Sequence, residues 1–340
     1  SFAGSRSPTT HPSAREFFHH NPSDLYALLD VGPSGLWHQH EDRLSFVAYA
    51  YGRQHIVDSG SYSYDDSVWR KHVVSTFAHN TVIVDGEGQH IRGTKETDED
   101  YILSEPLAHI WISETGFDYA SGFYDEGYGP RNDRTVTHRR RMLFVKPVAG
   151  SAGYWIVSDL LIPSDETQHH YETLFHLDVA PDEVKMDPMS LRAVTRTSFG
   201  STFAVWPVPM EGLAGEILAG QREPVLRGWQ RGRGTAVPLP VVSYTFRATG
   251  TARSLYVLYP IPEGSVLPID VVEATSARDA VAARVVFTNG RVHHIILPDQ
   301  SGHVTESDEI ETDGEAALVE TDAAGKLTRT ILAGGTRVSR

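Results

Sequence analysis

The chain has 340 residues and carries 30 Lys and Arg residues against 44 Asp and Glu residues, which gives a formal net charge of −14. Such an acidic balance argues against general nucleic-acid binding, because that function needs a basic surface. The sequence contains no cysteine but 17 histidines, so disulfides and thiol catalysis are excluded, whereas metal binding and proton transfer by histidine remain available.

Short apolar runs punctuated by Gly, Pro and Asp predict β-strands along most of the chain. In chain order, we expect strands at residues 44–51, 55–58, 81–84, 101–103, 109–113, 135–145, 154–160, 170–177, 193–195, 203–207, 241–248, 254–259, 284–288 and 291–297. Asn289-Gly290 between the last two predicts a hairpin, because this dipeptide favours tight turns between antiparallel strands. Helical periodicity is scarce, and the two short helices that we expect lie at residues 67–74 and 274–280. The pattern predicts an all-β fold, a large antiparallel β-sandwich with few helices.

The strand pattern is interrupted at residues 208–238, a segment rich in Gly, Pro and Arg that we interpret as a long loop or a seam. We expect the main sandwich and its chemistry in residues 1–207, and the remaining strands with a C-terminal β extension in residues 208–340. The acidic stretch 306–315 is typical of a solvated loop, and the basic run 138–141 of outward strand positions. No apolar run approaches the roughly 18 residues of a membrane span. The N-terminus lacks both a start Met and the apolar core of a signal peptide, so we expect a piece of a longer protein.

Residues that can bind a metal are concentrated in the first quarter of the chain. His38 and His40 stand two apart, so on a strand both side chains project to the same face. Asp58 follows 18 residues after His40. If residues 44–51 and 55–58 pair as a hairpin, the Asp58 carboxylate returns toward the two imidazoles. Two histidines and one carboxylate form a common type of zinc site with room for water or substrate.

Residues suited to proton transfer and anion binding follow in the same region. Tyr64 can donate or accept a proton, while Arg70 and Lys71 can hold a carboxylate, and His72 can assist them. His79 and Asn80 can neutralise a developing enolate. The alternative for Tyr64 is simple packing, and for His79 a core position with hydrogen bonds to the backbone.

Several motifs occur in a characteristic order. The run GPSGLWHQHEDRLSF at residues 32–46 joins a Gly-rich turn to His-x-His-x-Asp and a Ser-Phe strand. It is followed by VDSG at 57–60, WR at 69–70 and STFAHNTVIVDG at 75–86, and more loosely by residues 122–128 and HRRRMLFV at 138–145. This ordered set resembles the signature of heparinase II/III-like polysaccharide lyases over roughly residues 20–180.

The resemblance implies a two-part lyase in which an α/α toroid precedes a C-terminal antiparallel β-sandwich, and this chain resembles the sandwich. Enzymes of the family cleave uronate-containing polysaccharides such as heparan sulfate, alginate or hyaluronan by β-elimination. By the same resemblance, His38 matches the catalytic histidine on the sheet, and His40 and Asp58 match two ligands of a divalent metal, usually zinc. Tyr64 lies near the position of a substrate-contacting tyrosine in some relatives.

The sequence departs from the family pattern at the third metal ligand. Relatives take a histidine from the loop after the His-Asn-Thr strand, and here His90 is the first choice, with an acidic residue of the same loop as the second. The toroid has no counterpart in these 340 residues, so we expect it as a further domain or a partner subunit. Because a charge of −14 repels a polyanion, substrate binding would depend on local cations such as Arg70 and Arg92.

The sequence thus predicts a polysaccharide lyase acting on an acidic polysaccharide or oligosaccharide, with no nucleic-acid or membrane partner. The predicted residues are, for catalysis, His38, Tyr64, His79 and Asn80; for substrate contact, Trp37, Arg70, His72 and Arg92; and for the metal, His40, Asp58 and His90. The resemblance to this family favours a periplasmic or secreted bacterial protein, or a cytoplasmic one if it acts on oligosaccharides. The alternative function is a non-catalytic carbohydrate-binding or structural sandwich, which the missing toroid favours. A cupin-like metalloenzyme is less consistent, because its pattern needs Glu where Leu44 and Ser45 stand.

Overall fold

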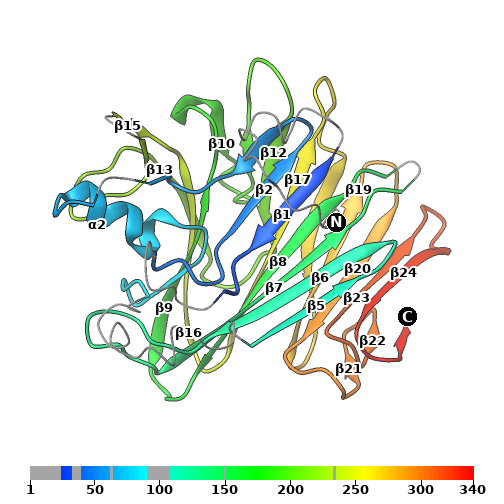
Figure 1. Cartoon of the computed structure of the whole chain (residues 1–340). Helices are drawn as coiled ribbons and strands as arrows, with labels where there is room; N and C mark the ends of the chain where they lie inside the picture. The colour runs from blue at the N-terminus through cyan, green and yellow to red at the C-terminus, as the bar shows by residue number, and fades with distance from the viewer. Residues whose placement is uncertain (1–23, 33–39, 62–63, 90–107, 149–150, 233–234) are drawn as a thin grey trace, which may run out of the picture.

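A computed structural model describes residues 24–32, 40–61, 64–89, 108–148, 151–232 and 235–340. Its centre is an antiparallel sheet of eight strands, in the order β10 (Val184–Met186), β11 (Ala193–Thr195), β12 (Thr202–Pro207), β17 (Ala252–Ile261), β8 (Tyr154–Pro163), β7 (Val136–Val145), β6 (Phe117–Tyr124) and β5 (His109–Ser113). The long strands of this sheet run through the middle of the molecule (Figure 1).

Smaller sheets cover the central one. Toward the C-terminus lies a five-stranded sheet of β18 (Ile269–Thr275), β19 (Ala280–Phe287), β20 (Val292–Pro298), β23 (Ala316–Thr321) and β24 (Leu327–Ala333). A three-stranded sheet contains β1 (Leu25–Leu29), β2 (Phe46–Ala50) and β3 (Arg53–Ile56), and a four-stranded sheet contains β13 (Ala214–Leu218), β16 (Val241–Thr249), β9 (Gln168–His176) and β4 (Val82–Val84).

The remaining elements lie at the periphery. They are the pair β14 (Trp229–Gly232) and β15 (Thr235–Pro238), the short strands β21 (Thr305–Glu306), β22 (Glu311–Thr312) and β25 (Val338–Ser339), helix α2 (Val68–Val74), and the 3-10 helices η1 (Thr76–Ala78) and η2 (Pro181–Glu183). Helix α2 lies on the opposite side of the molecule from the C-terminal strands β22 to β24 (Figure 1). Among the described residues, no helix is both long enough and apolar enough to cross a membrane.

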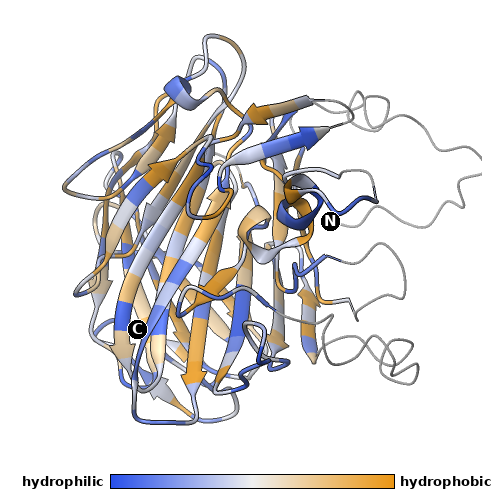
Figure 2. Cartoon of the chain, turned by 90° about the vertical axis from the view of Figure 1, so that its left-hand side faces the viewer, coloured by the Kyte–Doolittle hydropathy of each residue, from blue (hydrophilic) through white to orange (hydrophobic). Residues whose placement is uncertain are grey.

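Both faces of the central sheet are buried, which explains the long apolar runs of its strands. In β17, Leu255 and Val257 belong to the core shared with the five-stranded sheet, whereas Tyr256 and Leu258 belong to the core shared with the smaller sheets. This alternation is the two-residue period of a strand. Figure 2 shows hydrophobic residues along the strands of the sheets, interrupted by polar ones.

The structure confirms the all-β sandwich and several of its predicted elements. The Asn289-Gly290 turn joins β19 to β20, with Gly290 at a positive φ of 81°. Helix α2 forms where residues 67–74 predicted one. The second predicted helix, at 274–280, is wrong: β18 extends to Thr275 and β19 begins at Ala280. Residues 276–279 instead form the turn between these two antiparallel strands, and Asp279 has a positive φ of 50°, which no helix residue adopts.

Two of the sheets combine strands from before and after residue 207. Strand β16 pairs with β9, and β17 lies between β12 and β8. The predicted division at residue 207 therefore passes through the eight-stranded and the four-stranded sheet, while the five-stranded sheet lies wholly in residues 208–340. The segment 208–238, predicted as a loop or seam, contains β13, β14 and β15.

Two charged segments differ from their predicted exposure. His138, Arg139, Arg140 and Arg141 were expected to alternate outward, yet all four are buried. Because β7 lies within a sheet covered on both faces, its polar side chains need internal partners, and Arg140 forms an ion pair with buried Asp159. In the same way Glu315, in the acidic stretch expected to be solvated, is buried and pairs with Arg139.

Candidate functional site

The predicted hairpin carries Asp58 to the site. Strands β2 and β3 pair antiparallel and are joined by a turn in which Tyr51 and Gly52 have positive φ values of 49° and 89°. Directly after β3, the Val57 N–H donates to the His176 carbonyl of β9 at 3.0 Å. The next residue is Asp58, so two sheets fix the backbone on which this carboxylate stands.

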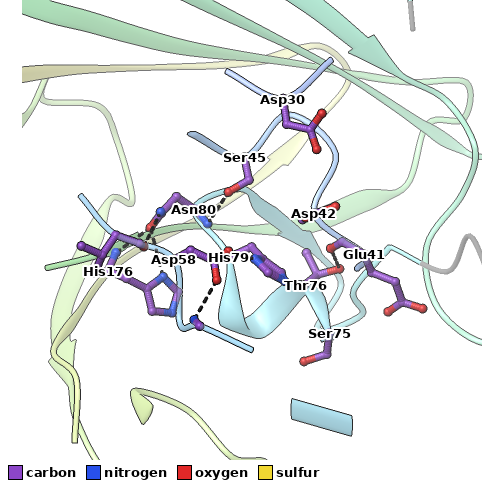
Figure 3. Close-up of polar contacts among 12 residues, drawn as sticks. Asp30, Glu41, Asp42, Ser45, Asp58, Ser75, Thr76, His79, Asn80 and His176 are labelled. Carbon is purple, nitrogen blue, oxygen red and sulfur yellow. Dashed lines mark hydrogen bonds and ion pairs between the residues drawn. The ribbon is translucent and has the colours of Figure 1, made fainter. Parts of the chain in front are cut away.

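Both oxygens of the Asp58 carboxylate have a partner. Oδ1 accepts a hydrogen bond from the Gly60 N–H at 2.7 Å, and Oδ2 lies 2.8 Å from His79 Nδ1. Gly60 has a φ of 93°, and a Cβ at this position would lie 2.5 Å from the Arg231 carbonyl oxygen. Only glycine fits such a turn, so the local sequence holds the Asp58 side chain toward His79 (Figure 3).

Asn80 clamps the strands that surround the pair. Its Nδ2 donates to the carbonyls of Phe46 and Val57, both at 2.8 Å, and its Oδ1 accepts from the His176 N–H at 2.7 Å. The amide thus joins β2, the end of β3 and β9, and Figure 3 shows its contact with His176. Because His79 precedes Asn80 in the chain, this clamp also fixes the position of the imidazole.

His40 completes a cluster of three potential metal ligands. Its ring centroid lies 5.2 Å from that of His79. One ligand atom each of His40, Asp58 and His79 can be chosen so that all three lie within 4.8 Å of one another. Ligands of a tetrahedral zinc ion, at bonds of about 2.0–2.1 Å, lie about 3.4 Å apart. Two imidazoles and a carboxylate are a donor set that zinc accepts, so the residues fit a metal after a small contraction.

Electrostatics keep one imidazole of the cluster neutral. Burial, followed by the charge of His79, lowers the pKa of His40 to about 4. Burial alone would lower the pKa of His79, but the hydrogen bond and charge of Asp58 outweigh it and raise that pKa. Burial would likewise raise the pKa of Asp58, but the contact with His79 lowers it. At neutral pH His40 therefore offers a free lone pair, as a metal ligand must.

The structure places the predicted substrate contacts in two different environments. The Tyr64 side chain is 66% exposed, and the guanidinium carbon of half-buried Arg70 lies 4.4 Å from the centre of its ring. His72, by contrast, is buried, and its Nε2 lies 3.3 Å from the Trp229 carbonyl oxygen. In this position His72 connects α2 to the segment 208–238.

His79 and Asn80, predicted to be catalytic, are both fully buried. This geometry favours a ligand position for His79 and a structural role for Asn80, whose amide is occupied by backbone groups. The other predicted site residues are His38, Trp37, His90 and Arg92; they lie outside the described residues, and their roles stay predictions.

Sequence reasoning missed the contribution of the segment 208–238. Trp229 meets Trp69 of α2 edge to face, with ring centroids 5.3 Å apart. Arg222 and Arg231 lie against the same rings. The available signal was a tryptophan among arginines within a Gly- and Pro-rich segment, since a large aromatic side chain seldom stands in a solvated loop.

Fold and site together describe an antiparallel β-sandwich that carries a His–Asp–His cluster of potential metal ligands. The family model described as heparinase II/III-like, C-terminal, matches residues 16–224. The match covers more than half of the chain, so the chain belongs to this family. This confirms the resemblance found in the sequence motifs.

Solved structures share the fold at low sequence identity. Heparan sulfate lyase HepC from Pedobacter heparinus, in a mutant form, is 17% identical with a TM-score of 0.59 over 83% of this chain and 40% of its own. A heparinase III structure with methylated lysines is 16% identical with a TM-score of 0.59, over 88% of this chain and 39% of its own. This chain thus spans about 40% of the length of such structures. A comparison with curated protein sequences gave no significant match.

Proposed function

We propose that this chain is the β-sandwich half of a polysaccharide lyase that cleaves a uronic-acid-containing saccharide by β-elimination. The observation that carries the proposal is the His40–Asp58–His79 cluster, which is held by hydrogen bonds on a fold of the heparinase II/III-like family. The polysaccharide lyases among the similar structures are longer, and a second half would complete the active site here.

The reaction removes the C5 proton of a uronate and expels the glycosidic oxygen at C4. The C5–H becomes acidic when a cation or hydrogen-bond donor neutralises the adjoining carboxylate. Arg70 suits this task, because its planar guanidinium can bind a carboxylate with two hydrogen bonds. A base then takes the proton while an acid protonates the leaving oxygen. Exposed Tyr64, beside Arg70, suits proton transfer, and His38 shares this task by family resemblance.

A divalent metal, in our proposal zinc, would be held by His40, Asp58 and His79, with His90 as a further candidate from the sequence pattern. When bound it would supply a fixed positive charge that neutralises the Asp58 carboxylate and stiffens the wall of the cleft. The residues themselves orient that wall: Gly60 and Asn80 hold Asp58 and His79 through backbone hydrogen bonds. A periplasmic or secreted location belongs to the same proposal, because large acidic polysaccharides lie outside the cell.

The experiment is an elimination assay on the native protein that contains this chain. Heparan sulfate, hyaluronan and alginate are each incubated with the protein, and the ultraviolet absorbance of the unsaturated uronate is followed. We expect product from at least one polymer, and loss of at least about 100-fold in kcat for His38→Ala, as for removal of a general acid or base. A matched control is His170→Ala, a change of the same type on β9 away from the cluster. Absence of product from all three polymers would refute the proposal.

A further inference from the structure

Beside the His40–Asp58–His79 cluster, two tryptophans and two arginines form a platform, which we define as Trp69, Arg222, Trp229 and Arg231. The guanidinium carbon of Arg222 lies 5.2 Å from the ring centre of Trp229 and 5.7 Å from that of Trp69. The guanidinium carbon of Arg231 lies 5.0 Å from the ring centre of Trp69. All three distances are typical of cation–π contacts, which hold an arginine in one orientation.

The platform is attached directly to the turn that carries Asp58. The Arg231 N–H donates to the Ser59 carbonyl at 2.8 Å, and Gly60 forms a parallel bridge with Arg231. On the other side, buried His72 of α2 contacts the Trp229 carbonyl. Platform and cluster are therefore joined through the turn of Asp58, Ser59 and Gly60.

Arg222 is chemically different from its neighbour in the same segment. Arg227 pairs with the buried Glu172 carboxylate, so its charge is neutralised inside the protein. Arg222 is exposed, and among the described residues it forms no ion pair. Stacking occupies the faces of its guanidinium and leaves the N–H groups at the edge available, in the fork that matches a carboxylate or a sulfate. On a protein with a net charge of −14, an unneutralised arginine held in place by two rings is suited to an anionic ligand.

We propose that this platform, through Arg222, binds an anionic group of the saccharide, a carboxylate or a sulfate, on the residue next to the one that is cleaved. This assignment rests on the proposed lyase function and defines its substrate more closely. Arg222 contacts the substrate away from the reacting atoms, so it contributes to binding and not to the chemical step.

The test compares Arg222→Gln with Arg222→Lys and with the control Arg247→Gln in the native protein. Arg247 is exposed near the end of β16, opposite His170 in the register of β16 and β9. The control therefore removes the same charge at a different place. We expect Arg222→Gln to raise KM about 10-fold, because a charge-assisted hydrogen bond is lost, with kcat changed less than about twofold. Arg222→Lys, which keeps the charge but loses the fork, should give an intermediate KM. Arg222→Gln should also weaken the salt dependence of KM.

Two substrates separate the two anions. If Arg222 binds a sulfate, the rise in KM appears on heparan sulfate and not on hyaluronan, which has carboxylates alone; if it binds a carboxylate, the rise appears on both. A KM for Arg222→Gln equal to that of Arg247→Gln on both substrates would overturn the proposal while leaving the lyase function intact.

Calorimetry separates this proposal from the proposed function, because it measures the binding of heparan sulfate and hyaluronan oligosaccharides without requiring turnover. If the wild type shows no elimination but binds, and Arg222→Gln binds about 10-fold more weakly, the platform stands and the lyase function fails. If the wild type binds neither oligosaccharide, or the variant binds as tightly as the wild type, the platform proposal is wrong.

Discussion

Two His–Asp pairs of equal length lie in different surroundings in this protein. His79 Nδ1 lies 2.8 Å from Asp58 Oδ2, and His138 Nε2 lies 2.8 Å from Asp159 Oδ1. The Asp58 side chain is 41% exposed, whereas Asp159 is fully buried. Contact distance alone therefore does not distinguish a candidate metal ligand from a structural ion pair.

The carboxylates of Asp58 and Asp159 differ in the third group that lies beside them. Arg140 donates to Asp159 from Nε at 2.7 Å and from Nη2 at 3.0 Å, so a permanent cation neutralises that carboxylate. Burial would raise the pKa of Asp159, but Arg140 and His138 hold it far below its usual range. Asp58 has the imidazole of His40 in the corresponding place, which burial keeps neutral. Asp159 thus has a permanent cation in Arg140, whereas Asp58 has a neutral imidazole in His40, which in our proposal binds a metal ion.

The largest expected effect is on the fully buried pair. Asp159→Asn should lower the free energy of unfolding by about 3–5 kcal/mol, because Arg140 would be left as an uncompensated buried charge. Asp58→Asn should cost less than about 1 kcal/mol when a chelator removes any metal, since its carboxylate is partly solvated. Urea unfolding with chelator present measures both, and equal losses would break the distinction between the two pairs.

A buried histidine without an acidic partner, His55, provides a contrast to the two His–Asp pairs. His55 is buried, its Nε2 lies 3.0 Å from the Ser201 hydroxyl, and burial lowers its pKa from 6.5 to about 3. The unfolded chain therefore binds this proton more readily, so stability is lost as the pH falls below about 6.5. Between pH 7.5 and pH 5 the wild type should lose about 2 kcal/mol more than His55→Gln. Urea unfolding at both pH values measures this, and the same loss in the two proteins would contradict the assignment of His55 as neutral.

A smaller loss of stability than at Asp159 or His55 is expected at the N-terminus of α2. The Ser67 hydroxyl caps α2 by accepting from the Arg70 N–H at 3.2 Å. Ser67→Ala should cost about 1 kcal/mol of stability, and Ser67→Asp should restore it, as for other N-caps. Thermal unfolding of the three proteins measures the effect. If Ser67→Ala unfolds like the wild type, the cap does not support the helix that carries Trp69, Arg70 and His72.

Sequence patterns predicted elements whose signals are local. Asn289-Gly290 forms its hairpin, and Ser67 begins α2, because both depend on a few neighbouring residues. The hairpin of β2 and β3 and the return of Asp58 toward His40 also followed from strand alternation. The predicted helix at 274–280 failed, because the pairing of β18 with β19 makes this segment the turn of a hairpin.

The parts of the site that depend on burial were not predictable from the sequence. The spacing of His79 and Asn80 indicates a functional segment but does not show that both lie beneath the surface. The clamp formed by Asn80 depends on carbonyls of β2 and on His176 of β9, which are far away in the sequence. Likewise, Arg222 reaches Trp69 across more than 150 residues of chain, and no local pattern connects the two.

The most direct test of the central claim, that His40, Asp58 and His79 bind a metal, is the metal content of the protein. The native protein is dialysed against zinc, freed of excess ion and measured by atomic emission. We expect about one zinc ion per chain in the wild type and in the control His170→Ala, and less than about a tenth of that in His40→Ala. A wild type without bound zinc, or a His40→Ala variant that retains it, would contradict the account.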